Sequence, residues 1–212
     1  QGGAVVGCVW NEKMEPVLTI ADSLDGLRPM QGSKYLSSST EHTYSQTKKL
    51  LDAGRMVLFT GTPCQCAGLL NFLRKPYDNL LTMDFLCHGV PSQMAFDAYR
   101  EHCEKHRSGK MSQYKCRDKS AHGWAISESY CVNGKKYTAH GMTSPYLFGF
   151  ISGYFNRYSL HRTPDTTAQN GRMWRLKIRL SSTRTKKRCR NCGKRSISRS
   201  RRTAGQLSKR NT

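Results

Sequence analysis

The stretch that decides the fold is the turn Thr60-Gly61-Thr62-Pro63-Cys64-Gln65, which joins an apolar run to a helical pattern. The apolar run at 56–59 is bounded by Gly and Pro and predicts a buried strand. The helical pattern occupies residues 65–73. A cysteine held in a Gly-Pro turn between these two elements indicates a chemical role rather than packing alone.

A second turn repeats this arrangement after the next apolar run. Residues 80–86 predict another buried strand, residues 93–106 predict a helix, and the turn between them is Cys87-His88-Gly89-Val90-Pro91-Ser92. Strands that alternate with helices predict an α/β fold with a mainly parallel sheet. Such sheets bind ligands outside the carboxyl ends of their strands. We therefore expect Cys64 and Cys87 to lie close together at one edge, as a redox or metal site.

The rest of the ordered sequence divides into an upstream part and an antiparallel section. Upstream, the patterns predict strands at 4–10 and 17–20, a short helix capped by Ser23 and a helix at 42–53. Beyond Gly109 the period changes to two, and strands are expected at 112–117, 125–132 and 136–140, with a hairpin turn at 133–134. An apolar, aromatic helix is expected at 144–155. The fold class is thus α/β, with an antiparallel strand section around 112–140.

The positive charge of this chain is concentrated in its C-terminal part. The net charge of the 212 residues is +21, but residues 1–160 hold 18 Lys and Arg against 13 Asp and Glu, whereas residues 161–212 hold 17 against Asp165 alone. Large apolar residues become sparse there, so burial cannot offset the ordering entropy. We expect one domain at residues 1–158 and a disordered basic tail at 159–212, and we interpret the abrupt change as a shifted reading frame.

Cysteine usage bears on the compartment. The chain has nine cysteines, no signal peptide and no apolar run near the ~18 residues of a membrane span. Reduced cysteines in a cytoplasmic protein indicate metal binding, redox chemistry or burial. The chain also begins directly in a strand, which predicts that an N-terminal part is absent.

Not every cysteine is expected to carry chemistry. Burial is the simplest explanation for four cysteines inside strand or helix patterns, namely Cys8, Cys103, Cys116 and Cys131. Cys66 is expected to enter the helix after Cys64. The lone Cys-x-x-Cys pair, Cys189 and Cys192, is weak evidence for a metal because four thiolates are the usual set.

Three loops contain residues suited to a cofactor. Gly61, Thr62 and Pro63 form a tight turn whose backbone N–H groups can approach a phosphate or a cluster sulfide. Ser33-Lys34-Tyr35 offers hydroxyl, ammonium and aromatic groups, although many surface loops have this composition. Arg117-Asp118-Lys119 could bind an anion, and the alternative is a solvated turn in which Asp118 pairs with a neighbour.

Taken together and in this order, these motifs resemble the coenzyme F420 hydrogenase/dehydrogenase beta-subunit family, and in particular its bacterial members. The resemblance covers roughly residues 1–158. It implies an oxidoreductase module that binds FAD and a 4Fe-4S cluster, with Cys64 and Cys87 as metal ligands. Family members carry a further Cys-x-x-Cys element after the aromatic helix, whereas this chain has no cysteine between Cys131 and Cys189.

The resemblance also implies a cofactor-binding set and a partner. The residues expected near the flavin, the cluster or the substrate are Ser33, Lys34, Tyr35, Gly61, Thr62, Pro63, Gln65, His88, Gly89, Arg117, Asp118 and Lys119. Electrons would pass between a ferredoxin-like domain or protein and a flavin or deazaflavin-type acceptor.

Two other functions are compatible with the residues. The basic tail could dock on nucleic acid or on an acidic partner with salt-sensitive affinity, but Trp174 is the only aromatic residue after Arg162 and no nucleic-acid fold signature accompanies it. A cysteine-nucleophile enzyme using Cys64 or Cys87 with His88 ranks last, because adjacent turn residues rarely present both side chains to one substrate.

Overall fold

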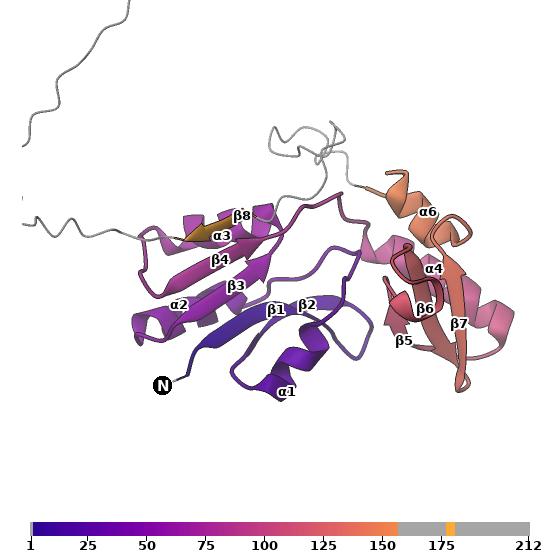
Figure 1. The fold of residues 1–212 in the computed structure, drawn as a ribbon, viewed down its shortest axis with the longest axis horizontal. Helices are drawn as coiled ribbons and strands as arrows, with labels where there is room; N and C mark the ends of the chain where they lie inside the picture. The colour runs from indigo at the N-terminus through magenta and orange to yellow at the C-terminus, as the bar shows by residue number, and fades with distance from the viewer. Residues whose placement is uncertain (1, 157–176, 181–212) are drawn as a thin grey trace, which may run out of the picture. The chain divides into compact units, whose positions relative to one another are not determined.

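The computed structural model describes residues 2–156 and the backbone of residues 177–180. Its first sheet has five strands in the order β2-β1-β3-β4-β8 (Figure 1). The strands are β1 (Ala4–Trp10), β2 (Pro16–Ala21), β3 (Val57–Gly61), β4 (Leu80–Asp84) and β8 (Lys177–Leu180). The three central strands β1, β3 and β4 run parallel, and the strands at the two edges, β2 and β8, run antiparallel to their neighbours. The predicted α/β class with a mainly parallel sheet is confirmed.

The helices that accompany this sheet are short. They are α1 (Leu24–Leu27), the 3-10 helix η1 (Arg28–Met30), α2 (Thr43–Asp52) and α3 (Pro63–Leu73). As predicted, the side chain of Ser23 caps α1 by accepting the Gly26 N–H. Apolar residues of the strands and of α2 and α3 form the first core: Val6, Leu18, Leu51, Val57, Phe59, Cys66, Leu69, Leu73, Tyr77 and Leu80. This core fixes the strand ends from which the predicted site residues extend.

The second sheet is antiparallel, with the order β5-β6-β7. Its strands are β5 (Met111–Lys115), β6 (Ser127–Val132) and β7 (Lys135–His140), and the helices of this region are α4 (Gln93–Arg107), α5 (Lys119–His122) and α6 (Pro145–Ile151). The β6–β7 turn has positive φ at both Asn133 (51°) and Gly134 (76°), as a type I′ hairpin requires. The predicted antiparallel section is therefore confirmed.

Strand β8 lies within the segment that the sequence predicts to be disordered. Its backbone pairs antiparallel with β4, from Leu81 opposite Leu180 to Asp84 opposite Lys177. The other residues of the predicted tail, including Cys189 and Cys192, lie outside the described part of the chain.

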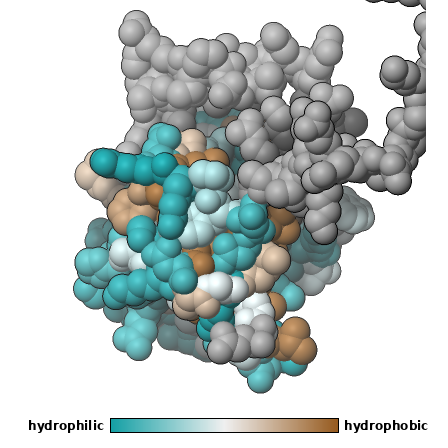
Figure 2. All heavy atoms as spheres, turned by 90° about the vertical axis from the view of Figure 1, so that its left-hand side faces the viewer, coloured by the Kyte–Doolittle hydropathy of each residue, from teal (hydrophilic) through white to brown (hydrophobic). Residues whose placement is uncertain are grey.

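One face of the described region has dispersed apolar side chains. On the face shown in Figure 2, polar residues separate the apolar ones. Within the described residues, no helix has the length and apolarity needed to cross a membrane.

Candidate functional site

The carboxyl edge of the parallel strands carries both predicted metal ligands. Strands β3 and β4 are neighbours in register, with Gly61 opposite Asp84 at their last pairing. Cys64 follows β3 in the first turn of α3, and Cys87 follows β4 in the loop before α4. The matched positions of the two cysteines therefore bring them to the same edge of one sheet, as the strand pattern predicts.

The N-terminus of α3 presents Cys64 to solvent. Thr62 is the N-cap, Pro63 is the first helical residue and Cys64 is exposed. The Thr62 hydroxyl lies 3.0 Å from the Cys64 sulfur. The positive end of the helix dipole favours a negatively charged ligand atom at this point, so the local structure suits a thiolate.

Gln65 fixes the conformation of this turn rather than facing solvent. Its Oε1 accepts the Thr62 N–H at 3.0 Å, and its Nε2 donates to the Ser38 hydroxyl at 2.7 Å. Its backbone carbonyl accepts a hydrogen bond from the Tyr44 phenol at 2.9 Å. A Cβ on Gly61 would lie 3.0 Å from Gln65 Oε1, so this position favours glycine.

The loop after β4 holds Cys87 in a partly buried position. Burial raises the pKa of the Cys87 thiol, a hydrogen bond from the Gly89 N–H opposes this rise, and the nearby Cys64 adds to it. Cys64 also contributes to the raised pKa of Cys66, whose main cause is burial. Cys64 therefore makes a minor contribution to the raised pKa of both other thiols.

Gly89 has a conformation that other residues adopt only under strain. Its φ is +119°, and a Cβ there would lie 2.6 Å from the Asn156 side chain. Asn156 in turn donates to the His88 carbonyl at 3.1 Å. The loop that carries Cys87 is therefore held against the segment after α6.

His88 and Tyr35, two predicted site residues, both contact the ring of Phe150. The Nε2–H of His88 donates to the Ile151 carbonyl at 2.8 Å, and its ring lies edge-on to Phe150 with centroids 5.4 Å apart. The Tyr35 ring stacks on Phe150 at 4.7 Å. The backbone of Tyr35 is fixed at both ends, because its N–H donates to the Cys116 sulfur and its carbonyl accepts from Tyr146.

Lys34 is occupied by backbone carbonyls. Its Nζ donates at 3.0–3.2 Å to four consecutive carbonyls, those of Pro29, Met30, Gln31 and Gly32. Burial lowers the pKa of Lys34, and the thiols of Cys8 and Cys116 oppose this effect. Lys34 therefore closes the end of η1 in this conformation, while Ser33 beside it is exposed.

The predicted residues Arg117, Asp118 and Lys119 bond to their own neighbourhood. Arg117 donates to the Trp124 carbonyl at 3.3 Å, and the Lys119 ammonium lies 3.6 Å from the centre of the Trp124 ring. Asp118 is buried and pairs with Lys136 at 2.7 Å. The pairing alternative for Asp118 is thus observed, although the residue is buried rather than solvated.

The described residues do not contain a complete set of ligands for a metal cluster. Within them, no group of three or more His, Cys, Asp or Glu side chains is arranged to hold a metal. Cys66 is buried in α3, and Cys103 and Cys116 are also buried. A 4Fe-4S cluster is usually held by four thiolates, and Cys64 and Cys87 by themselves would supply two of these ligands.

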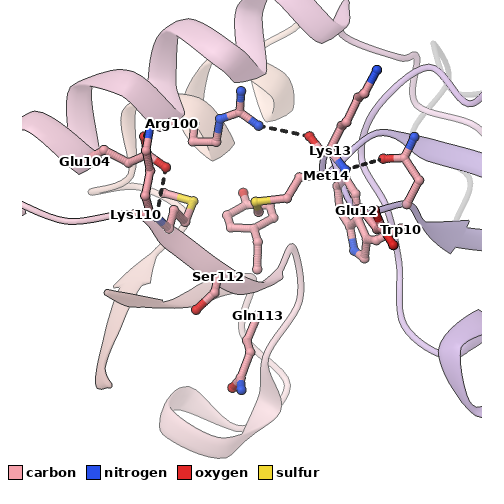
Figure 3. A pocket seen from close by; sticks show the side chains of 12 residues that line it. Trp10, Glu12, Lys13, Met14, Arg100, Glu104, Lys110, Ser112 and Gln113 are labelled. Carbon is pink, nitrogen blue, oxygen red and sulfur yellow. Dashed lines mark hydrogen bonds and ion pairs between the residues drawn. The ribbon is translucent and has the colours of Figure 1, made fainter. Parts of the chain in front are cut away.

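A cavity of about 520 Å³ lies at the carboxyl end of β1 (Figure 3). The residues that line it are Trp10, Asn11, Glu12, Lys13, Met14, Arg100, Glu104, Lys110, Met111, Ser112, Gln113 and Tyr114. Because β1 is parallel to β3, this cavity opens from the same edge of the sheet as Cys64. None of its residues belongs to the set that the sequence predicts.

The cavity combines aromatic walls with cationic groups. Trp10 and Tyr114 lie edge to face with centroids 6.0 Å apart. Figure 3 shows Arg100 reaching from α4 to the Lys13 carbonyl, at 3.0 Å, and Lys110 paired with Glu104. The ammonium of Lys13 has no ion-pair partner within residues 2–156. Glu12 and Glu104 also line the cavity, so it carries charges of both signs, and its aromatic surface suits a planar ligand.

Sequence reasoning missed this cavity for an identifiable reason. Trp10 ends a strand, and Lys13 lies in a turn. Arg100, Lys110 and Tyr114 lie about ninety to a hundred residues later, in α4, in the loop after it and in β5, and only the tertiary fold joins them to Trp10 and Lys13. The one signal available in the sequence was a Trp at the carboxyl end of a predicted strand.

Comparisons with known proteins agree with the resemblance. A family model describes the C terminus of the beta subunit of coenzyme F420 hydrogenase/dehydrogenase, and it matches residues 54–198, more than half of the chain. The match extends beyond residue 158 into the segment for which the sequence predicts a shifted frame. A search of curated proteins finds no match.

A solved structure is also similar. It is a xenon-derivatised F420-reducing NiFe hydrogenase complex from Methanosarcina barkeri, with 14% identity and a TM-score of 0.45. The similarity covers 74% of this chain and 52% of the hydrogenase chain. This chain therefore spans about half the length of that one.

Proposed function

The chain belongs to the coenzyme F420 hydrogenase/dehydrogenase beta-subunit family, and we propose that it acts as an iron–sulfur flavoprotein module. In this proposal it passes electrons between a ferredoxin-like partner and a flavin or deazaflavin-type acceptor. Family membership supports the general statement, a redox module related to F420 hydrogenase. The cofactors, the acceptor and the partner are our inference from the residues described above.

The single observation that carries the proposal is the pair of cysteines at one sheet edge. Cys64 and Cys87 follow neighbouring parallel strands, and the charge of Cys64 contributes to the raised pKa of Cys87. Buried structural cysteines have no need of such a position. Two thiols that follow neighbouring strands, one of them at a helix N-terminus, are suited to holding a cluster.

The loop around Cys87 would tune the electronic properties of a bound cluster. A 4Fe-4S cluster supplies one-electron transfer when bound, and hydrogen bonds to its sulfur ligands influence its potential. The Gly89 N–H already bonds the Cys87 sulfur. The remaining two ligands would come from outside residues 2–156 or from a partner chain.

We assign the flavin or deazaflavin-type acceptor to the cavity at the end of β1. Trp10 and Tyr114 offer aromatic surface for a planar ring, and the Lys13 ammonium offers positive charge for a phosphate or carboxylate. The cavity volume lies in the usual range for small-molecule sites. The set Ser33 to Tyr35 and Arg117 to Lys119 remains our proposal for FAD, through backbone groups and Arg117 more than through Lys34.

The domain assignment also remains a proposal. The sequence pattern places the redox module at residues 1–158 and a basic tail at 159–212, but β8 pairs with β4 in the first sheet, and we propose that the module includes this strand. The family match to residue 198 supports a longer module than this.

Anaerobic reconstitution tests the cluster assignment. We would incubate the full chain with ferrous iron and sulfide and follow the broad visible absorption and the EPR signal after reduction. Cys64→Ser and Cys87→Ser should each abolish or strongly reduce both signals. Cys131→Ser, a partly buried cysteine on β6, is the matched control and should reconstitute like the natural chain. Equal loss in all three variants, or none in any, would refute the assignment.

Binding of the acceptor is tested separately. Titration with an oxidised flavin mononucleotide or with the deazaflavin coenzyme, followed by quenching of ligand fluorescence, gives affinity. Lys13→Gln should weaken binding about tenfold, because it removes a positive charge from the cavity. Lys135→Gln, an exposed change on β7 of the second sheet, should have no effect. If instead the control variant weakened binding and Lys13→Gln did not, the acceptor would bind at the second sheet.

A further inference from the structure

Helix α4 carries two exposed histidines near its C-terminal end. His102 and His106 are four residues apart, and their ring centroids lie 4.4 Å from each other with the planes at 66°. Positions four apart on an α-helix occupy one face, one turn above the other. The proximity of the two rings therefore follows from the helix itself and does not depend on a loop.

Both rings are available to a ligand. Within the described part of the chain, no side chain or backbone group bonds either imidazole, and the rings contact each other. Cys103 lies between them in sequence, but it is buried in the second core and does not share their exposed face. The exposed pair thus offers nitrogen ligands without thiolate.

The chemistry of this pair is that of a two-point chelate. Neutral imidazole nitrogens bind Zn²⁺, Ni²⁺ and Cu²⁺ in preference to Mg²⁺ or Ca²⁺, which favour oxygen. Two histidines at positions i and i+4 are the spacing by which helices in metalloproteases hold zinc. With only two protein ligands, the remaining coordination positions would be filled by water.

Charges of both signs surround His102 and His106, and the helix dipole favours binding of a cation there. α4 has 15 residues and ends at Arg107, so His106 lies in its last turn, where the negative end of the helix dipole favours a cation. Glu101 adds negative charge, and Lys105 opposes it. Arg107 is drawn away, because its guanidinium stacks 4.1 Å from the centre of the Tyr137 ring.

We propose that His102 and His106 form a surface site for a late first-row divalent cation, held by one nitrogen from each ring. The site is separate from Cys64 and Cys87 in residues and in chemistry. It does not depend on the redox function proposed above.

A second histidine pair provides an internal contrast. The rings of His122 and His140 are 5.8 Å apart, but the Nδ1 of His122 bonds the Ser127 hydroxyl at 3.1 Å, and the Nδ1 of His140 accepts the Met142 N–H at 3.3 Å. An accepting Nδ1 leaves the proton of a neutral ring on Nε2. A metal would have to displace that proton or break the hydrogen bond, so this pair should bind less well.

The test is a titration of the full chain with nickel chloride, followed through the histidine ring signals by NMR. Site-resolved signals separate this site from metal bound at cysteines. The signals of His102 and His106 should broaden together and at the lowest nickel concentration. His102→Gln should raise the concentration that broadens His106 by about tenfold or more, because chelation is lost.

Three controls keep the result interpretable. Gln is a good helix former, so the metal-free thermal midpoint of His102→Gln should match that of the natural chain. His122→Gln should leave the His102 and His106 response unchanged, and magnesium chloride should not broaden either signal. The proposal is overturned if His106 titrates identically with and without His102, or if the signals of His122 and His140 broaden at the same nickel concentration.

Discussion

The phenol of Tyr114 donates a hydrogen bond of 2.7 Å to Oε2 of Glu128, a carboxyl group that is completely buried in β6. Tyr99 donates to the other carboxyl oxygen. Both phenols have a raised pKa, chiefly through burial, so they remain donors across the range in which the carboxyl group titrates.

The first prediction concerns the pH dependence caused by Glu128. Burial raises its pKa, although the phenols oppose this, so the folded chain retains a proton that the unfolded chain has lost. Stability should therefore fall as the pH rises from about 4 toward the raised folded pKa. In Glu128→Gln this fall should disappear, as measured by urea unfolding across that range.

Two comparisons sharpen this test. Glu128→Ala leaves both phenols without an acceptor and should cost on the order of 3 kcal/mol. Glu101→Gln, an exposed change on α4, should retain the pH dependence of the natural chain. If Glu128→Gln also retained it, the pH dependence would arise from a group other than Glu128.

The second prediction has the opposite sign. Hydrogen bonds from Lys136, then from Ser129 and the Ser120 N–H, hold the pKa of Asp118 well below its usual value. The unfolded state then binds more protons, so this stability is present above about pH 4 and is lost as the pH falls through the folded pKa. Asp118→Asn should cost about 2 kcal/mol at neutral pH and clearly less in acid. An equal loss at both pH values, by the same unfolding measurement, would contradict the linkage.

The third prediction separates strain from steric overlap at Gly89. Gly89→Ala places a Cβ 2.6 Å from Asn156 at a φ of +119°, and it should destabilise the chain by about 1–3 kcal/mol. Adding Asn156→Ala removes the overlap but leaves the strained φ. The double variant should therefore recover part of the thermal midpoint. Full recovery would mean that the backbone conformation costs nothing.

The fourth prediction orders the thiols by reactivity. Burial raises the pKa of Cys66 to about 11 and that of Cys116 to about 12, whereas Cys64 is exposed. Since the thiolate is the reactive species, iodoacetamide at mildly alkaline pH should modify Cys64 first and Cys116 last. Peptide mass spectrometry gives the order, and in denaturant the difference should vanish. Labelling of Cys116 as fast as Cys64 in the folded chain would argue against its burial.

The strands and helices were predicted well because each is marked by a short run of neighbouring residues in the sequence. The apolar runs before Cys64 and Cys87 form β3 and β4, and the period-two section forms the second sheet. Helix α5 was missed because its four residues, Lys119–His122, are too few to show a period. The predicted helix at 144–155 is shorter in the structure, Pro145–Ile151, since Ser152 and Gly153 end it.

The roles of single polar residues were harder to predict, because they depend on distant partners. Lys34 has the composition of a cofactor ligand, yet its ammonium is surrounded by four carbonyls. Glu128 lies in a strand that is buried on both faces, so the alternation of polar and apolar residues could not identify it as a core residue. Asp118 required Lys136, which the hairpin brings beside it.

Strand β8 has a consequence for the order of folding. Its residues pair with those of β4, which lie about a hundred positions earlier in the sequence. We expect this long-range pairing to form late, because the segment between the two strands must close first. Until then, β4 is an edge strand at residues 81–84, and its unpaired backbone N–H and C=O groups can form hydrogen bonds with a strand of another chain. During synthesis, the chain therefore passes through a stage in which its parallel strands are complete but their last edge is unprotected.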